Sequence, residues 1–149
     1  MKKMWIWLLV GAVSLTTACE KSDGNDLSLL EKNHPEVVEA LMSRYPAARV
    51  VDVDYGQGLA EIDIVDGSFR REVWYTMDGS WRRTETDLRT ADLPSAVSNA
   101  WKSSEYGNYR VDEVDLIDSP EGSYYRLDLE MGGKRDVILK IDPNGVLLS

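Results

Sequence analysis

One feature of the sequence constrains the fold of this chain more than any other. A predicted helix followed by strand-like runs of alternating apolar and polar residues occurs twice. Pro35 and Pro94 each stand near the start of a stretch in which apolar residues recur at helical spacing. Proline is tolerated there, since the N–H that it lacks would have no partner in a first helical turn. The apolar residues are Val38, Leu41, Met42 and Tyr45 in the first stretch and Val97, Ala100 and Trp101 in the second. Each predicted helix therefore has one apolar stripe that another element must cover.

Runs in which apolar and polar residues alternate follow each predicted helix. They span residues 51–55, 61–64, 72–77, 125–131 and 136–141, with a less regular run at 111–117 that we interpret as a bulged strand. Period-two alternation gives one buried and one solvated face, which is typical of antiparallel sheets. Turn signals separate the runs, among them Asp66-Gly67, Asp78-Gly79, Gly132-Gly133 and Asn144-Gly145.

We therefore predict an α+β fold in which tandem duplicated helix-then-antiparallel-meander units form one sheet, with the helices packed on one face. The domain covers residues 32–149, with the first repeat at about 33–88 and the second at about 92–149. Asp63 aligns with Asp128, and Asp78 aligns with Asp142. The alternative is that two unrelated segments carry similar signals by coincidence.

The N-terminal segment predicts export. Lys2 and Lys3 precede an apolar run, and small residues then lead to Cys19, the single cysteine. The run is shorter than the ~20 residues that cross a bilayer, which favours a cleaved signal over a membrane span. The pattern resembles a bacterial lipoprotein signal, with residues 1–18 removed and Cys19 acylated. Cleavage after Ala18 by an ordinary signal peptidase is the alternative.

Residues 19–31 are polar and acidic at their start and predict a flexible tether. The expected location is the periplasm or the cell surface. The lipid on Cys19 is expected to anchor the protein in a bacterial membrane, with a Gram-negative outer membrane as the leading expectation. Without the signal the chain keeps 26 acidic and 15 basic residues, a net charge of −11. Such a charge repels phosphate backbones and excludes nucleic acid as a partner.

Two short patterns carry a family resemblance. The helix start Leu93-Pro94-x-x-Val97 and the hairpin Tyr75-x-x-Asp78-Gly79-x-Trp81, within duplicated units behind a lipoprotein signal, resemble the PepSY-like, β-lactamase-inhibitor-like envelope proteins over about residues 32–149. The resemblance implies tandem domains with a four-stranded sheet per repeat and no catalytic machinery. It also implies binding through the sheet face, as in the β-lactamase inhibitor protein of similar architecture. The disulfides of that inhibitor have no counterpart here, so the resemblance names no target.

The residues present argue against catalysis. A nucleophilic triad needs a histidine base, and His34 at the start of the first predicted helix is the single histidine. One cysteine and one histidine do not form a tetrahedral zinc set, and no phosphate-binding glycine loop occurs. We therefore expect no enzymatic activity and no cofactor.

Acidic residues offer an alternative function. Alternation puts Asp52 and Asp54 on one face of a strand and Glu61 and Asp63 on one face of the next. Four carboxylates close together could hold Ca²⁺, which prefers oxygen ligands. A domain that binds calcium or a small ligand is therefore the alternative function, and the solvated side of an acidic sheet is the simpler explanation.

An aromatic and arginine patch carries the leading hypothesis. A two-residue hairpin at Asp78-Gly79 would set Trp81 opposite Thr76 and Trp74 opposite Arg83. The predicted protein-binding residues are Trp74, Trp81, Arg83 and Ile138, the last by its equivalence to Trp74 in the second repeat. A different turn register would instead bury Trp81. The chain is thus predicted to be a non-enzymatic, lipid-anchored, inhibitor-like envelope protein that binds an unidentified envelope protein or peptide through its exposed sheet face.

Overall fold

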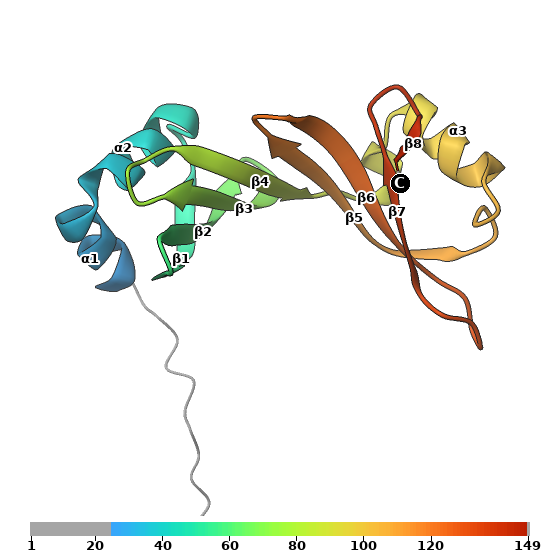
Figure 1. Ribbon diagram of the computed structural model, residues 1–149, viewed down its shortest axis with the longest axis horizontal. Helices are drawn as coiled ribbons and strands as arrows, with labels where there is room; N and C mark the ends of the chain where they lie inside the picture. The colour runs from blue at the N-terminus through green and yellow to red at the C-terminus, as the bar shows by residue number, and fades with distance from the viewer. Residues whose placement is uncertain (1–24, 149) are drawn as a thin grey trace, which may run out of the picture.

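The computed structural model describes residues 25–148 of the chain (Figure 1). Two helices, α1 (Asn25–Asn33) and α2 (Pro35–Arg44), open this part, and α3 (Ser95–Ser103) follows a 3-10 turn at Thr90–Asp92. The helices lie at the two ends of an elongated molecule, with the sheet between them. The predicted signal peptide at 1–18, the proposed lipidation site Cys19 and the first residues of the predicted tether lie outside the described residues. None of the helices within 25–148 is long and apolar enough to cross a membrane.

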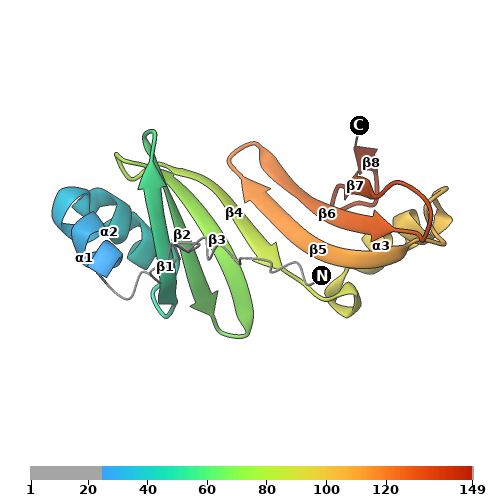
Figure 2. The same ribbon diagram turned by 90° about the horizontal axis from the view of Figure 1, so that it is seen from below.

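The strands form one antiparallel sheet in which each strand pairs with its neighbours in the chain (Figure 2). In order they are β1 (Arg49–Gly56), β2 (Leu59–Asp66), β3 (Phe69–Thr76), β4 (Trp81–Asp87), β5 (Arg110–Ser119), β6 (Gly122–Glu130), β7 (Val137–Ile141) and β8 (Leu147–Leu148). The predicted α+β class with a single antiparallel sheet is confirmed. Each half has helical structure followed by four strands, and the origin of the halves by duplication stays a prediction.

Two apolar cores lie on the same face of the sheet. The first packs under α1 and α2 and comprises Leu30, Val37, Leu41, Val53, Ala60, Ile62, Ile64, Val73 and Tyr75. The second packs under α3 and comprises Leu93, Val97, Trp101, Val114, Leu127, Leu129, Leu139 and Ile141. Val73 lies opposite Thr84 and, two residues along β4, Thr86 lies opposite Leu116, which faces Tyr125. Because this register continues the inward-facing positions from one half to the other, all three helices cover one face.

Two expectations about the helical region are corrected. The flexible tether predicted for residues 19–31 is wrong for residues 25–31, which belong to α1. Leu30 is fully buried in the first core, and burial of this side chain orders a segment whose neighbours are mostly polar. On α2 the buried residues are Val37 and Leu41, whereas Met42, predicted to be inward, is exposed.

Matching hairpins fasten a helix to the sheet in each half. Gly79 follows β3 with φ +82°, and a Cβ there would lie 2.7 Å from the backbone oxygen of Glu36 in α2. Gly145 follows β7 with φ +87°, and a Cβ there would lie 2.8 Å from the backbone oxygen of Ala96 in α3. Positive φ and the close helix approach both favour glycine at these two positions. The turn signals read from the sequence therefore also set how near each helix can come.

Candidate binding face

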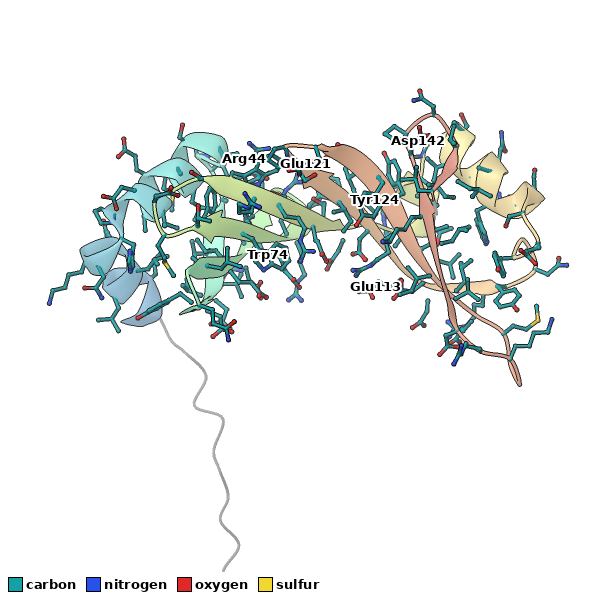
Figure 3. The ribbon with its side chains drawn as sticks, viewed as in Figure 1. Arg44, Trp74, Glu113, Glu121, Tyr124 and Asp142 are labelled. Carbon is teal, nitrogen blue, oxygen red and sulfur yellow. The ribbon has the colours of Figure 1, made fainter. Side chains whose placement is uncertain are left out.

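The face of the sheet opposite the two cores, here called the open face, carries the predicted site. None of the three described helices packs into it, because all three belong to the cores on the other side. In Figure 3, Trp74 and Glu113 lie on the side of the sheet away from Arg44 of α2. One cross-strand row on the open face consists of Asp54, Glu61, Trp74 and Arg83, from β1 to β4.

Trp74 is held between two charged neighbours on the open face. Its Nε1 donates a hydrogen bond to Oε2 of Glu61 at 3.1 Å, and Cζ of Arg83 lies 4.1 Å from the centroid of its ring. Nη2 of Arg83 in turn lies 3.1 Å from Oε1 of Glu85. The predicted pairing of Trp74 with Arg83 is confirmed. These contacts leave the indole of Trp74 half-buried and hold it in one orientation. Binding a partner would therefore not require this side chain to be ordered first.

Trp81 lies on the other face, and its predicted place beside Trp74 is wrong. The β3–β4 hairpin has a three-residue loop, Met77–Gly79, closed by the hydrogen bond from Thr76 N to Ser80 O at 2.9 Å. The register then shifts between Trp74 and Tyr75, so Trp81 pairs with Tyr75 and packs against the first core. The guanidinium Cζ of Arg44 stacks 3.6 Å from the centroid of the Trp81 ring. A bulge, which reverses side-chain direction locally, explains the difference from the predicted two-residue turn.

A second row on the open face is made of carboxylates. Asp52, Asp63, Glu72 and Glu85 stand opposite one another in successive pairs from β1 to β4. Burial raises the pKa of Asp63, and the charges of Glu61, Asp52 and Asp54 raise it further, while Arg70 opposes them. The pKa of Glu72 is raised for the same reasons, burial first and then Asp63. In this row, burial and the repulsion between neighbouring carboxylates both disfavour the ionised form.

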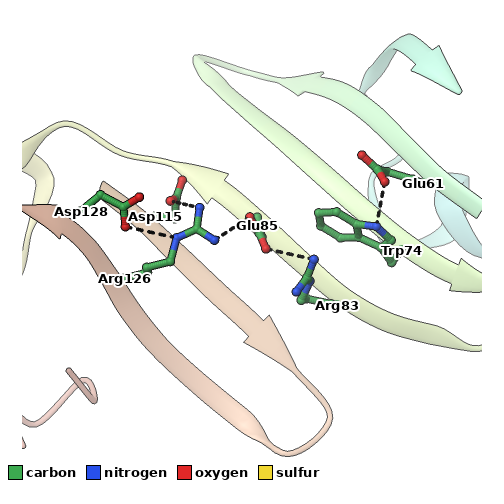
Figure 4. Close-up of polar contacts among 7 residues, drawn as sticks. All are labelled: Glu61, Trp74, Arg83, Glu85, Asp115, Arg126 and Asp128. Carbon is green, nitrogen blue, oxygen red and sulfur yellow. Dashed lines mark hydrogen bonds and ion pairs between the residues drawn. The ribbon is translucent and has the colours of Figure 1, made fainter. Parts of the chain in front are cut away.

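A polar network continues the open face into the second half (Figure 4). Nη2 of Arg126 donates a hydrogen bond to Oδ2 of Asp115 at 2.8 Å, and its Nη1 lies 3.6 Å from Oε2 of Glu85. Asp128 is a third carboxylate neighbour, 3.8 Å from Nε of Arg126. Asp115 is only 2 % exposed, and this burial raises its pKa to about 6 although Arg126 acts to lower it. The network joins β4, β5 and β6 where the two halves meet.

The remaining part of the open face is mixed in character. Ile138 stands opposite Asp128 and is 61 % exposed, so the structure puts this predicted residue on the open face. Lys140, two residues along β7, has Nζ 5.6 Å from the ring centroid of Tyr124. The hairpin closures align Thr76 with Asp142, which makes Lys140 rather than Ile138 the counterpart of Trp74. The role of Ile138 in binding stays a prediction.

The predicted metal ligands are brought together only in part. Oxygens of Glu61, Asp63 and Glu72 lie within 4.8 Å of one another, a set that adds Glu72 to the prediction. Asp52 and Asp54 stand on the neighbouring strand, opposite Asp63 and Glu61. Three carboxylates on a sheet face are suitable oxygen donors for Ca²⁺, which takes six to eight oxygen ligands. The three would leave several of these positions to other donors.

A hollow of about 340 Å³ opens beside Trp74, at the end of the β1–β2 hairpin. The residues that line it include Asp54, Tyr55, Leu59, Glu61 and Trp74. Pockets of this size are at the small end of ligand sites and suit a single side chain or a small group.

Comparison with known proteins adds a family to this geometry. The model of the family described as "Putative beta-lactamase-inhibitor-like, PepSY-like" matches residues 58–149. The chain belongs to this family. The resemblance that the sequence motifs indicate is therefore confirmed for most of the chain.

Solved structures resemble this PepSY-like chain over most of its length. A BLIP-like protein of Bacteroides fragilis is 28% identical, with a TM-score of 0.72 over 77% of this chain and 82% of its own. A DUF2874 family protein of Bacteroides ovatus is 26% identical, with a TM-score of 0.71 over 76% and 83%. A protein from Bacteroides eggerthii, described as "putative periplasmic proteins", is 25% identical, with a TM-score of 0.69 over 76% of this chain and 84% of its own. No curated protein matches this chain.

Sequence reasoning missed the centre of the open face of this PepSY-like chain. Glu72 and Arg126 stood on predicted strands as ordinary polar positions, and nothing marked them as members of a shared network. The signal that could have found Asp115 is its place between Val114 and Leu116, where alternation turns it away from the core. Its burial depends on the neighbouring strands β4 and β6, which a single strand pattern does not reveal.

Proposed function

We propose that the chain is a non-enzymatic, lipid-anchored envelope protein that binds another protein or a peptide on its open face. The observation that carries this proposal is Trp74 stacked with Arg83 on a sheet face that no described helix covers. Tryptophan and arginine supply a large share of the energy in many protein interfaces. The family description adds an inhibitor-like action, in which the bound partner is an enzyme of the envelope.

The contacts around Trp74 favour binding over a purely structural role. Arg83 and Glu61 hold the indole in one orientation, so little side-chain entropy is lost when a partner covers it. The stacked pair itself contributes only about 0.5–1 kcal/mol at an exposed site. Such a small gain is a weak reason to hold a tryptophan on a solvated face, whereas a partner that desolvates it would gain considerably more.

The test replaces the pair and follows capture of the native partner. A photo-crosslinking residue at position 138 of the full chain, activated in intact envelopes, should yield a crosslinked partner that mass spectrometry identifies. The double variant Trp74→Ala/Arg83→Ala should lose that crosslink, whereas Leu29→Ala/Lys32→Ala, a matched apolar and cationic pair on α1, should keep it. Equal crosslinking by both variants, with unchanged thermal unfolding, would remove the open face as the binding site.

We also propose that residues 1–18 direct export and that Cys19 carries the lipid anchor. The support is the sequence pattern of this segment, and one relative of similar fold is described as periplasmic. Several acyl chains would give durable attachment, at ~0.8 kcal/mol per buried methylene. Replacing Cys19→Ala should move the protein from the membrane fraction to the soluble fraction, and unchanged fractionation would contradict lipidation at this residue.

Cation binding is a second candidate, favoured by the convergence of Glu61, Asp63 and Glu72. Calorimetry of the purified chain with Ca²⁺ tests it directly. Binding predicts measurable heat and a higher melting temperature at millimolar ion, because a ligand that binds only the folded state stabilises it. The variant Glu61→Gln should abolish both effects. If the wild-type chain shows no heat of binding at millimolar Ca²⁺, the calcium-binding hypothesis is rejected.

A further inference from the structure

We propose that the segment bound by the open face is basic, with one lysine or arginine side chain in the hollow beside Trp74 and a second along the carboxylate row of Asp52, Asp63 and Glu72. This proposal rests on the proposed function and specifies the chemistry of its partner. It also places both basic side chains on the first half of the sheet, from β1 to β4.

The hollow has the composition that recognises a cation. Trp74 lines it together with the acidic residues Asp54 and Glu61, and none of the residues that line it is a lysine or arginine. A cation near an aromatic face gains energy from the ring quadrupole, and a charge-assisted hydrogen bond to a carboxylate is stronger than a neutral one. Arg83, 4.1 Å from the Trp74 ring centroid, already makes such a stacking contact within the chain. A ligand cation would repeat this chemistry at the hollow.

The carboxylate row supplies a second and separate reason. Like charges directly opposite on neighbouring strands are destabilising, and this row sets four carboxylates side by side. Arg83 and Arg126 both contact Glu85, at one end of the row. Among the described residues no ion pair reaches Asp52, Asp63 or Glu72, although Arg70 lines a hollow together with Asp63 and Glu72. A basic partner would supply the compensation that the chain itself lacks.

The spacing of the two features matches an extended peptide. Glu61 and Asp63 are two residues apart on β2, and positions i and i+2 of a strand lie about 6.5–7 Å apart on the same face. An extended segment that runs along β2 has the same spacing between its own alternate side chains. Two basic residues separated by one residue would therefore meet the hollow and the row together.

Charge on the rest of the molecule agrees with this choice of partner. The chain has a formal net charge of −9, which attracts cationic segments and repels acidic ones. On the open face of the first half, Arg70 and Arg83 stand among six carboxylates, those of Asp52, Asp54, Glu61, Asp63, Glu72 and Glu85. In the second half, Arg126 and Lys140 stand among fewer, those of Glu113, Asp115 and Asp128. A basic segment is therefore favoured on β1–β4 over β5–β7.

The test is a selection of binders from random ten-residue peptides displayed on phage, with the full chain immobilised. Selected peptides are then made with a fluorescent label, and their dissociation constants are measured by anisotropy. The open-face variant Glu61→Gln/Asp63→Asn/Glu72→Gln is compared with Glu31→Gln/Glu36→Gln/Glu39→Gln, which removes the same charge from exposed positions of α1 and α2. The proposal predicts peptides enriched in lysine or arginine at alternate positions. It also predicts a tenfold or greater loss of affinity in the open-face variant and less than a twofold loss in the helix variant.

The outcomes separate this inference from the proposed function. Peptides without basic enrichment that still require Trp74 and Arg83 would overturn the basic partner while leaving sheet-face binding in place. Equal loss in both triple variants would reduce the effect to general charge and overturn the assigned site. Basic peptides indifferent to Trp74→Ala, Arg83→Ala and the open-face triple variant would overturn both proposals. Selection of no basic binder would likewise overturn the peptide site.

Discussion

The buried carboxyl of Asp115 provides a quantitative test of how the centre of the open face is balanced. Two effects compete there, because burial disfavours the carboxylate and the guanidinium of Arg126 favours it. The pKa rises from 3.8 to about 6, so burial prevails. At about 1.4 kcal/mol per pKa unit, the folded protein penalises the ionised form by about 3 kcal/mol. The unfolded chain has no such penalty.

Stability should therefore fall as pH rises through the window between the unfolded and folded pKa values. The folded state binds more protons than the unfolded state in this window, so its contribution is favourable below about pH 4 and lost by about pH 7. About 2 kcal/mol of the change falls between pH 4 and pH 7. Asp115→Asn does not titrate, so the free energy of unfolding of the wild type should decline by that amount relative to the variant over this interval.

The assay is urea unfolding followed by circular dichroism at pH 4, 5, 6 and 7. Asp112→Asn, at an exposed position of the same strand, is the matched control and should show a much smaller pH-dependent difference from the wild type. A constant difference between wild type and Asp115→Asn would mean that burial does not set this pKa. A wild type that gains stability over the variant with rising pH would mean that the ion pair with Arg126 outweighs burial.

Three further predictions concern the core, a turn and the carboxylate row. Leu127→Ala should lower the free energy of unfolding in urea by about 2–5 kcal/mol, because Leu127 is fully buried, and a loss below about 1 kcal/mol would contradict the core assignment. Gly79→Ala should lower the melting temperature more than Gly58→Ala. Both glycines have positive φ, but only a Cβ at position 79 would meet the backbone of Glu36, so equal losses would refute the helix contact. Glu72→Gln should raise stability at pH 7 by a few tenths to about 1 kcal/mol by removing like-charge repulsion, and the gain should vanish at pH 3, where the wild-type carboxyl is protonated. A destabilised Glu72→Gln protein at pH 7 would show that the row is compensated within the chain.

Much of the fold could be predicted from the sequence because alternation in a strand is a local property. The alternating polar residues on either side of Val73 and Leu127 indicate which face of the sheet these two side chains occupy. Consecutive strands joined by short turns pair with one another. The helix starts at Pro35 and near Pro94 follow from local chemistry in the same way. The order of the sheet and the side that the helices cover are consequences of these local signals.

The parts that could not be predicted depend on register. Trp81 changed faces because a three-residue loop and a bulge replaced the expected two-residue turn. Leu30 was assigned to a tether because residues 20–26 are polar, although Leu27 and Leu30, three residues apart on α1, both reach the first core. The network of Glu85, Asp115 and Arg126 joins three strands, so it exists only after their pairing is known. The pairing of Trp74 with Arg83 was predictable because these residues lie on the two strands of one hairpin.

The division of the apolar interior has a mechanical consequence. Among the described residues the two cores share no member, while the backbone ladder between β4 and β5 passes unbroken from one half to the other through four residue pairs. Bending at this seam would strain the β4–β5 ladder and the contacts of Arg126 with Glu85 and Asp115, but it would not require either core to repack. The sheet therefore has two separately packed halves, and a change in its curvature on binding would be taken up at β4 and β5 rather than inside either core.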